Sequence, residues 1–335
     1  VMATAFAPGK CILFGEHAVV YGHPAVAVAI DAGVEVKLDF SDEWGIKNSY
    51  YANEYMKYQE DKNPHIHHII NDVFDYDGPP LRINIESDLF SAAGLGSSAA
   101  LSNAMGAALH KLTKPEEKID RIELAKIGHS AEASAQSGRA SPTDSAASSL
   151  GGCVVVSGGK NDDWEHVFDT SLMTPEGERK WSIHSIDLHE KISNSWLVLG
   201  FTGEASPTGD MVSGVASRLK ENPELYDEMK AEIEDGGQPK QRTKAKIIGM
   251  IQKNHDDIGH VIYGKVYLGQ KEIDQSTGNT KIVSQVNGEV WNITERRPKL
   301  VSSVSPAVFA GLGSTLDVAR TNALKQSSES SSKTI

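Results

Sequence analysis

The sequence predicts a globular α+β protein with two domains. The chain has 335 residues, which suggests two domains at roughly 100–200 residues each. With 39% hydrophobic and 23% charged residues, its composition is that of a globular protein with a real core. Segments with the spacing of strands and segments with the spacing of helices occur in both halves of the chain.

Charge and cysteine content argue against several classes of protein. A formal net charge of −12 does not suit a protein that binds nucleic acid through a broad basic face. No run reaches the roughly 18 apolar residues of a membrane span. The apolar N-terminal stretch is interrupted by Lys10, Glu16 and His17, which argues against a signal peptide. Cys11 and Cys153 are expected to be buried thiols, so we expect a cytoplasmic protein.

The first part of the chain predicts strands followed by a helix. Residues 3–40 contain short apolar bursts separated by Gly and Pro, which is typical of several strands. Residues 42–63 are polar and lose this pattern. After Pro64, apolar residues recur at helical spacing as far as Phe74. The segment LRINIESD, residues 81–88, alternates like a half-buried strand.

The next part predicts a loop and two helices. The Gly-rich run SAAGLGSSAA, residues 91–100, leads into the helical pattern SSAALSNAMGAALHKL. A second helix is expected over 121–136, followed by GRASPTDS, residues 138–145, as a loop. The run LGGCVVVSGG, residues 150–159, then predicts a buried strand.

The remainder of the chain is more varied. Residues 183–200 favour strands, and residues 201–222 pass from a loop into a helix. A linker at 234–241 precedes another helix at 244–261. Between 263 and 294, strand-like runs flank Asn287-Gly288, a dipeptide typical of a tight hairpin.

The Gly-rich run raises the question of phosphate binding. A loop that wraps a polyphosphate needs glycine where backbone N–H groups approach oxygen atoms, followed by a helix whose N-terminus favours negative charge. This run meets both needs, although it lacks the ending of a P-loop and the spacing of a dinucleotide-binding loop. A plain helix cap is the alternative interpretation.

Charged residues in two other segments need partners. Lys10, Glu16 and His17 lie in the strand-forming run APGKCILFGEHAVVYGHPA, where an unpaired charge costs about several kcal/mol. Asp144 lies among the small residues of ASPTDSAASSLGG. The alternatives are that Lys10 is a solvated strand end, that His17 is a satisfied core residue and that Asp144 caps a helix.

Together these segments resemble the GHMP family of small-molecule kinases. APGKCILFGEHAVVYG is similar to the family's first motif, and AAGLGSSAA is similar to its ATP-phosphate loop. GHSAEASAQSGRASPTDSAASSLGG resembles the segment with the magnesium ligand and the catalytic aspartate. FTGEASPTGDMVSGV resembles the substrate-side loop and helix. The nearest counterpart of a third, Gly-rich loop is SPAVFAGLGSTLDVAR, with Gly311 and Gly313.

The resemblance implies a two-domain GHMP kinase fold of the α+β class. An N-terminal domain like ribosomal protein S5 is expected over 1–185, with the ATP-phosphate loop and the catalytic aspartate. A ferredoxin-like C-terminal domain for substrate binding and closure is expected over 186–325, and residues 326–335 are expected to be a disordered tail. A homodimer is also implied, with ATP as co-substrate and Mg²⁺ as cofactor.

The resemblance also implies a role for individual residues. Asp144 is expected to accept or orient the proton of the substrate hydroxyl, and Lys10 to keep that carboxylate ionised. Ser98 and Glu132 are expected to hold Mg²⁺. The residues expected to bind the ATP phosphates are Gly94, Leu95, Gly96, Ser97, Ser98 and Ala99. Those expected to line the substrate pocket are Glu16, His17 and Thr208.

The implied reaction is transfer of the γ-phosphoryl group of ATP to the C5 hydroxyl of mevalonate. Another GHMP kinase, acting on phosphomevalonate, galactose or homoserine, is one alternative, and a non-catalytic small-molecule sensor on the same fold is another. His65, His67 and His68 form a histidine-rich stretch, but this spacing does not bring all three to one helix face, so we expect no zinc site.

Overall fold

A computed structural model describes residues 2–15, 18–90, 92–175, 177–187 and 196–201, and short segments at 217, 219–224, 227, 265–267, 285–286, 289–290, 308–313 and 318–321. The chain divides into two compact units. The first consists of Val1–Cys11, Ala27–Ser91 and Leu95–Ile186, and the second of Ile12–Val26, Ala92–Gly94 and Asp187–Ile335. The predicted linker, the helix at 244–261 and the tail lie outside the described residues.

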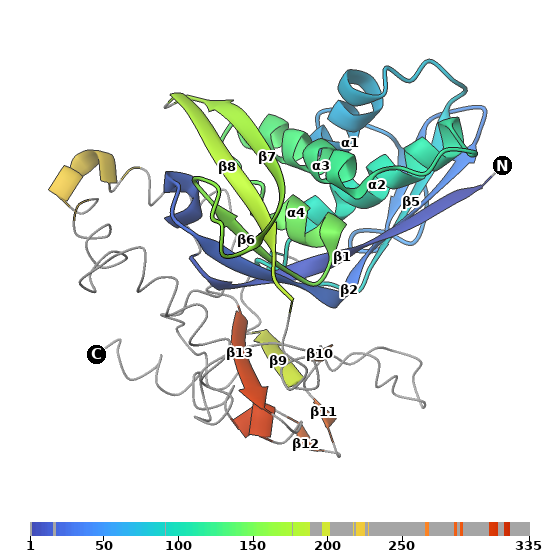
Figure 1. Ribbon diagram of the computed structural model, residues 1–335. Helices are drawn as coiled ribbons and strands as arrows, with labels where there is room; N and C mark the ends of the chain where they lie inside the picture. The colour runs from blue at the N-terminus through green and yellow to red at the C-terminus, as the bar shows by residue number, and fades with distance from the viewer. Residues whose placement is uncertain are drawn as a thin grey trace. The chain divides into compact units, whose positions relative to one another are not determined.

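The first unit is built on an eight-stranded sheet with the strand order β4-β3-β5-β2-β6-β8-β7, in which β1 also pairs with β2 (Figure 1). The pair β3–β5 is parallel, and β2–β5, β3–β4, β6–β8 and β7–β8 are antiparallel. The strands are β1 (Ala3–Phe14), β2 (Ala25–Phe40), β3 (Gly45–Asn48), β4 (Met56–Lys57), β5 (Leu81–Ser87), β6 (Cys153–Ser157), β7 (Glu165–Thr174) and β8 (Gly177–Ser185).

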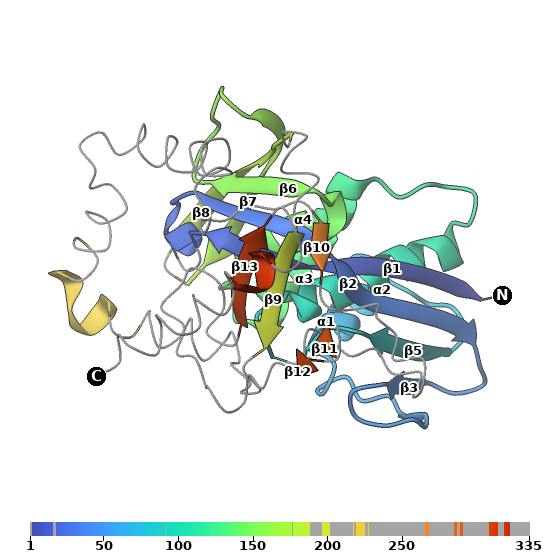
Figure 2. The ribbon, with the colours of Figure 1, turned by 90° about the horizontal axis from the view of Figure 1, so that it is seen from below.

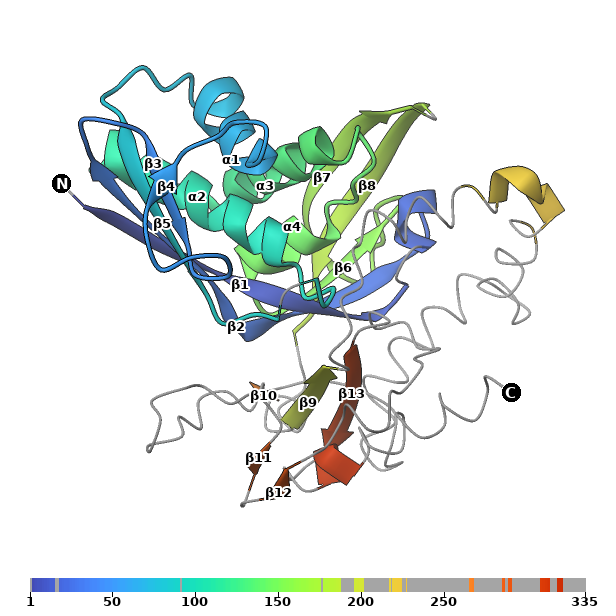
Figure 3. The same ribbon diagram turned by 180° about the vertical axis from the view of Figure 1, so that it is seen from behind.

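The helices of this unit gather on one face of the sheet, as Figures 1 and 3 show. They are α1 (Pro64–His67), the π-helix η2 (His68–Val73), α2 (Ser97–Thr113), α3 (Arg121–Ala135) and α4 (Thr143–Leu150). Small residues make much of the buried face of α2, which lets its neighbours approach closely. Among the described residues, no helix is long and apolar enough to span a bilayer.

Most elements of this unit agree with the sequence. The strands within 3–40, the strand over 81–87 and the buried strand at 153–157 are confirmed, as are α2 and α3. The helix after Pro64 is only partly confirmed, because its α-helical part has four residues and continues as the π-helix η2.

Three features differ from the expectations. The polar stretch 42–63 contains the short strands β3 and β4, and the hairpin of β7 and β8 was not expected. Much of β7 is exposed, so its sequence lacks the apolar pattern of a buried strand. The predicted loop at 138–145 is wrong at its end, because α4 begins at Thr143 and places Asp144 in its first turn.

The second unit contains a three-stranded sheet and a hairpin (Figure 2). Strand β9 (Trp196–Phe201) pairs in parallel with β10 (Lys265–Tyr267) and antiparallel with β13 (Val308–Gly313). Strands β11 (Gln285–Val286) and β12 (Glu289–Val290) pair antiparallel on either side of Asn287-Gly288, which confirms the hairpin. The short 3₁₀-helix η1 spans Ala18–Tyr21, and residues 219–221 are helical as expected. Gly311 and Gly313 were the nearest counterpart of the family's third, Gly-rich loop. Both lie on strand β13 and not in a loop.

Helices α2, α3 and α4 meet at a buried polar side chain. Asn103 of α2 is fully buried, and its Nδ2 donates a hydrogen bond to the carbonyl oxygen of Ser145 on α4 at 3.0 Å. On α3, Gly128 faces this amide so closely that a Cβ atom at Gly128 would overlap Asn103 Oδ1. The absence of a side chain at Gly128 therefore sets how closely the three helices approach.

We expect Gly128→Ala to destabilise the protein. In an exposed helix this change stabilises by up to about 1 kcal/mol, because alanine has the higher helix propensity. Here the new methyl group has no space, and overpacking should lower the free energy of unfolding by about 1–3 kcal/mol. Urea denaturation followed by circular dichroism measures the change.

The matched control is Gly159→Ala, where a Cβ would meet nothing within 4 Å and stability should stay within about 0.5 kcal/mol. A Gly128→Ala protein as stable as the parent would show that the helices have room to spare at this point.

Candidate active site

Lys10 and Asp144 form an ion pair between a buried ammonium group and a carboxylate side chain that is 25% exposed. Strand β1 carries Lys10 into the interior, where only 4% of its side chain is exposed, and Nζ lies 3.1 Å from Asp144 Oδ1. This position contradicts the interpretation of Lys10 as a solvated strand end. Asp144 is not a helix cap either, because Pro142 occupies that position and α4 has no side-chain cap. The carboxylate therefore has a specific charged partner.

The pKa of Asp144 is raised above its ordinary value. Burial is the main cause, because it penalises the charged carboxylate, and the negative charge of Glu132 acts in the same direction. Lys10 opposes both through its charge and its hydrogen bond. Lys10 thus favours the ionised carboxylate of Asp144, as expected, but desolvation has the larger effect and the pKa is raised.

A second polar pair links α2 to α3. Ser98, in the first turn of α2, donates a hydrogen bond from Oγ to Glu132 Oε2 at 3.1 Å. Gln136, at the end of α3, donates from Nε2 to the same oxygen at 2.8 Å. Glu132 is 5% exposed, so this carboxylate is held inside the protein by groups from two helices.

The loop before α2 has a shape that depends on glycine. Gly96 is the N-cap residue of α2 with φ +70°, and no side chain caps this helix. The loop is tied to β1, because the N–H of Lys10 donates to the carbonyl oxygen of Leu95 at 2.9 Å.

Gly96 is also packed against Lys10. A Cβ atom at Gly96 would lie 2.9 Å from Lys10 Cγ and 3.1 Å from Lys10 Cε. Glycine is thus required here by its left-handed backbone and by the lysine stem. A methyl group at this position would displace the stem of Lys10.

Some predicted site residues are not brought together in one unit. Leu95, Gly96, Ser97, Ser98 and Ala99 belong to the first unit. Gly94, with φ +72°, belongs to the second. The predicted substrate residues Glu16, His17 and Thr208 lie outside the described residues.

The structure adds residues that the sequence did not single out as part of this site. Gln136 and His65 both contact Glu132, and Asn103 holds α4 next to Asp144. Asn103 and Gln136 lie in ordinary helical patterns that carry no distinguishing signal. His65 belongs to a noticeable histidine-rich stretch, which was considered only as a zinc site.

The chain is similar to known small-molecule kinases in both sequence and family model. Residues 64–152 match the GHMP kinases N terminal domain, so the class of protein is a small-molecule kinase of the GHMP type. Two curated relatives named mevalonate kinase are similar over most of the chain. The protein of Methanothermobacter thermautotrophicus is 31% identical over 87% of this chain and 83% of its own length, and that of Pyrococcus abyssi is 30% identical over 75% and 71%.

The fold has a solved counterpart. The crystal structure of the Methanococcus jannaschii mevalonate kinase covers 77% of this chain and 75% of that chain, with a TM-score of 0.53 and 23% identity. The sequence similarities show that the chain belongs to the mevalonate kinase family. The GHMP kinase fold expected from the sequence is confirmed.

We expect the carboxyl group of Asp144 to titrate above the ordinary aspartate value of about 3.9. NMR of protein labelled with ¹³C at aspartate carboxyl groups measures this pKa, and Asp144→Asn assigns the signal. Because Lys10 lowers the pKa, Lys10→Met should raise it further, whereas Lys10→Arg should leave it nearer the parent value. A parent pKa at or below the ordinary value would mean that the charge of Lys10 outweighs the effects of burial and Glu132.

Proposed function

We propose that the protein transfers the γ-phosphoryl group of ATP to the C5 hydroxyl of mevalonate, giving 5-phosphomevalonate. The observation that carries this proposal is the Lys10–Asp144 ion pair, on a fold whose curated relatives are named mevalonate kinase. Phosphoryl transfer needs mainly placement of the reactants and stabilisation of charge, which a small set of fixed residues supplies.

Asp144 would accept or orient the proton of the C5 hydroxyl. Its raised pKa brings the carboxylate closer to the working pH of a general base. Lys10, at 3.1 Å, favours the ionised form of Asp144 and offsets negative charge near the transferred phosphoryl group. The first turn of α4 fixes Asp144, and β1 fixes Lys10, so the pair needs little reorganisation.

Ser98 and Glu132 fit a magnesium site. Mg²⁺ takes oxygen ligands at about 2.0–2.1 Å in octahedral geometry, so two neighbouring ligands lie about 3 Å apart. Ser98 Oγ and Glu132 Oε2 are 3.1 Å apart. A bound Mg²⁺ would neutralise charge on the ATP phosphates and take its other ligands from them and from water.

The start of α2 would receive the ATP phosphates. Its first turn has no side-chain cap, so its N–H groups and the positive end of the helix dipole suit an anion. The residues assigned to this role are Gly94, Leu95, Gly96, Ser97, Ser98 and Ala99. Glu16, His17 and Thr208 are assigned to mevalonate, as the family resemblance implies.

The resemblance also supports a proposed organisation and location. The domain over 1–185 would supply the phosphate loop and Asp144, and the domain over 186–325 would close over the substrates. The protein would act as a cytoplasmic homodimer. Light scattering of the purified chain tests the oligomeric state.

We expect ATP-dependent phosphorylation of mevalonate and not of other GHMP kinase acceptors. A coupled assay of ADP release, run with mevalonate, phosphomevalonate, galactose and homoserine, tests this. Mass spectrometry of the product identifies 5-phosphomevalonate. ADP release with another acceptor alone would assign a different kinase activity, and binding of mevalonate without turnover would favour the small-molecule sensor.

We expect Asp144→Asn to lower turnover by at least about a hundredfold, the usual scale for a positioned acid–base group. ATP affinity should stay within a few-fold, because the assigned phosphate contacts lie on α2 and its loop. The control is Asp162→Asn, which removes the same charge from an exposed turn and should leave turnover unchanged. Melting curves of both variants detect unfolding. Nearly full turnover of Asp144→Asn would remove Asp144 from the reaction.

A further inference from the structure

A histidine from α1 approaches the buried glutamate of the candidate metal site. His65 Nε2 lies 3.0 Å from Glu132 Oε1, and the two side chains are 20% and 7% exposed. Neither of these two buried atoms has a hydrogen-bond partner among the described residues, and the contact between them is an ion pair and not an aligned hydrogen bond. The imidazole and this carboxylate oxygen are therefore available to each other.

The two oxygens of Glu132 face different groups. Oε2 accepts hydrogen bonds from Ser98 and Gln136, which places it on the side of the proposed magnesium site. Oε1 faces His65. The terminal torsion of a glutamate is broad, so contacts to one oxygen alone leave the carboxylate free to twist. A donor on Oε1 would fix the plane of the carboxylate.

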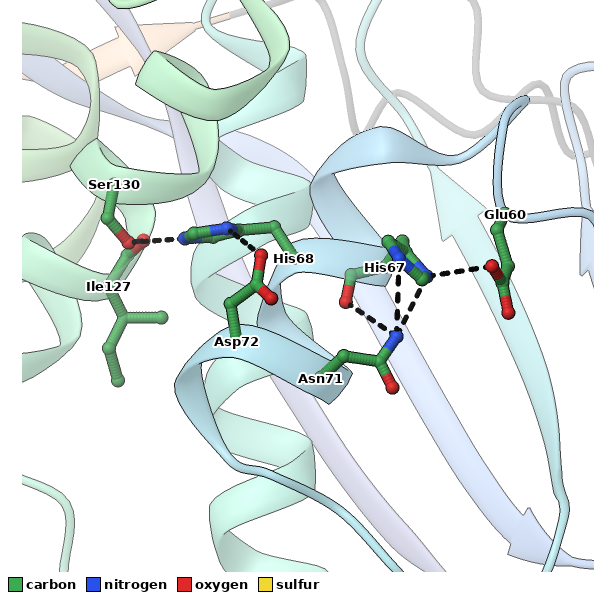
Figure 4. A network of polar contacts seen from close by, with 7 residues as sticks. All are labelled: Glu60, His67, His68, Asn71, Asp72, Ile127 and Ser130. Carbon is green, nitrogen blue, oxygen red and sulfur yellow. Dashed lines mark hydrogen bonds and ion pairs between the residues drawn. The ribbon is translucent and has the colours of Figure 1, made fainter.

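The segment that carries His65 is itself anchored to α3. Three residues further on, His68 Nε2 lies 3.1 Å from Ser130 Oγ, and Nδ1 lies 2.8 Å from Asp72 Oδ2 (Figure 4). Ser130 Oγ in turn donates to the carbonyl oxygen of Ile127 at 2.9 Å. Residues three apart on a helix share a face, so His65 and His68 reach α3 together.

His67 has a different environment. It contacts Asn71 and Glu60, as Figure 4 shows, and neither of these residues belongs to the proposed site. The three histidines thus have three separate sets of partners. His67 offers a natural control for the loss of an imidazole from the same segment.

We propose that His65 is a positioning residue: a small turn of its ring from the observed 3.0 Å contact lets Nε2 donate its proton to Glu132 Oε1, which holds Oε2 toward Ser98 and the metal. This inference rests on the proposed function, because it assigns Glu132 to the metal. Magnesium prefers oxygen ligands, and His65 contacts the oxygen that faces away from Ser98, so His65 supports the ligand and is not itself one.

Metal-dependent ATP binding tests the proposal without any phosphoryl acceptor. Mn²⁺ replaces Mg²⁺, and electron paramagnetic resonance measures free Mn²⁺ as the full-length protein is titrated in the presence of ATP. Loss of a group that supports a metal ligand typically costs about 10–100-fold in affinity, so His65→Leu should weaken Mn²⁺·ATP binding by that factor. His65→Gln, which keeps a side-chain N–H donor, should recover part of the loss.

Three further variants separate positioning from general stability. His67→Leu should bind Mn²⁺·ATP like the parent. His68→Leu loses an anchor of the segment to α3 and should melt at a lower temperature, with a smaller effect on Mn²⁺ binding than His65→Leu. Glu132→Gln removes the charge of the proposed metal ligand itself, so we expect it to weaken Mn²⁺·ATP binding more than any of the histidine variants.

The outcomes distinguish this inference from the proposed function. A folded His65→Leu protein that binds Mn²⁺·ATP within twofold of the parent overturns the positioning role alone. Equal losses in His65→Leu and His68→Leu also overturn it, because they indicate a purely structural anchor. Parent protein whose ATP binding does not respond to Mn²⁺ contradicts the metal site of the proposed function, and the role of His65 with it.

Discussion

The arrangement of the candidate site depends on the close meeting of α2, α3 and α4. Each of these helices carries one of its polar groups, Ser98, Glu132 and Asp144, and none of the three can be placed unless the helices hold a fixed separation. Asn103 bridges α2 to α4, and Gly128 leaves it space on α3. Because protein interiors are close-packed, a change of one methyl group at this crossing would move the site.

The electrostatics of the site follow from burial. Burial and the negative charge of Glu132 both disfavour the ionised form of Asp144 and raise its pKa, and Lys10 compensates only part of this cost. A divalent cation held by Ser98 and Glu132 would offset the remainder. The two neighbouring carboxylates would therefore favour binding of a metal with nucleotide.

Local residue patterns in the sequence predicted the strands within 3–40, helices α2 and α3, the strand β6 and the pairing of β11 with β12. Those elements carry their signal within a few residues, as apolar spacing or turn chemistry. The hairpin of β7 and β8 escaped prediction because exposed strands need no apolar pattern. Contacts of His65 and Asn103 could not be predicted, since each partner lies 42 to 67 residues away and is reached only through helix packing.

Gly96 connects the proposed phosphate loop with the Lys10–Asp144 ion pair. Its left-handed backbone ends the loop and starts α2, and its missing side chain makes room for the stem of Lys10. The N–H of Lys10 also bonds to Leu95 in the same loop. Any movement of the loop is therefore transmitted to the ammonium group beside Asp144. If phosphate binds in this loop as proposed, the contacts of Gly96 and Leu95 with Lys10 would link its occupation to the alignment of the Lys10–Asp144 pair.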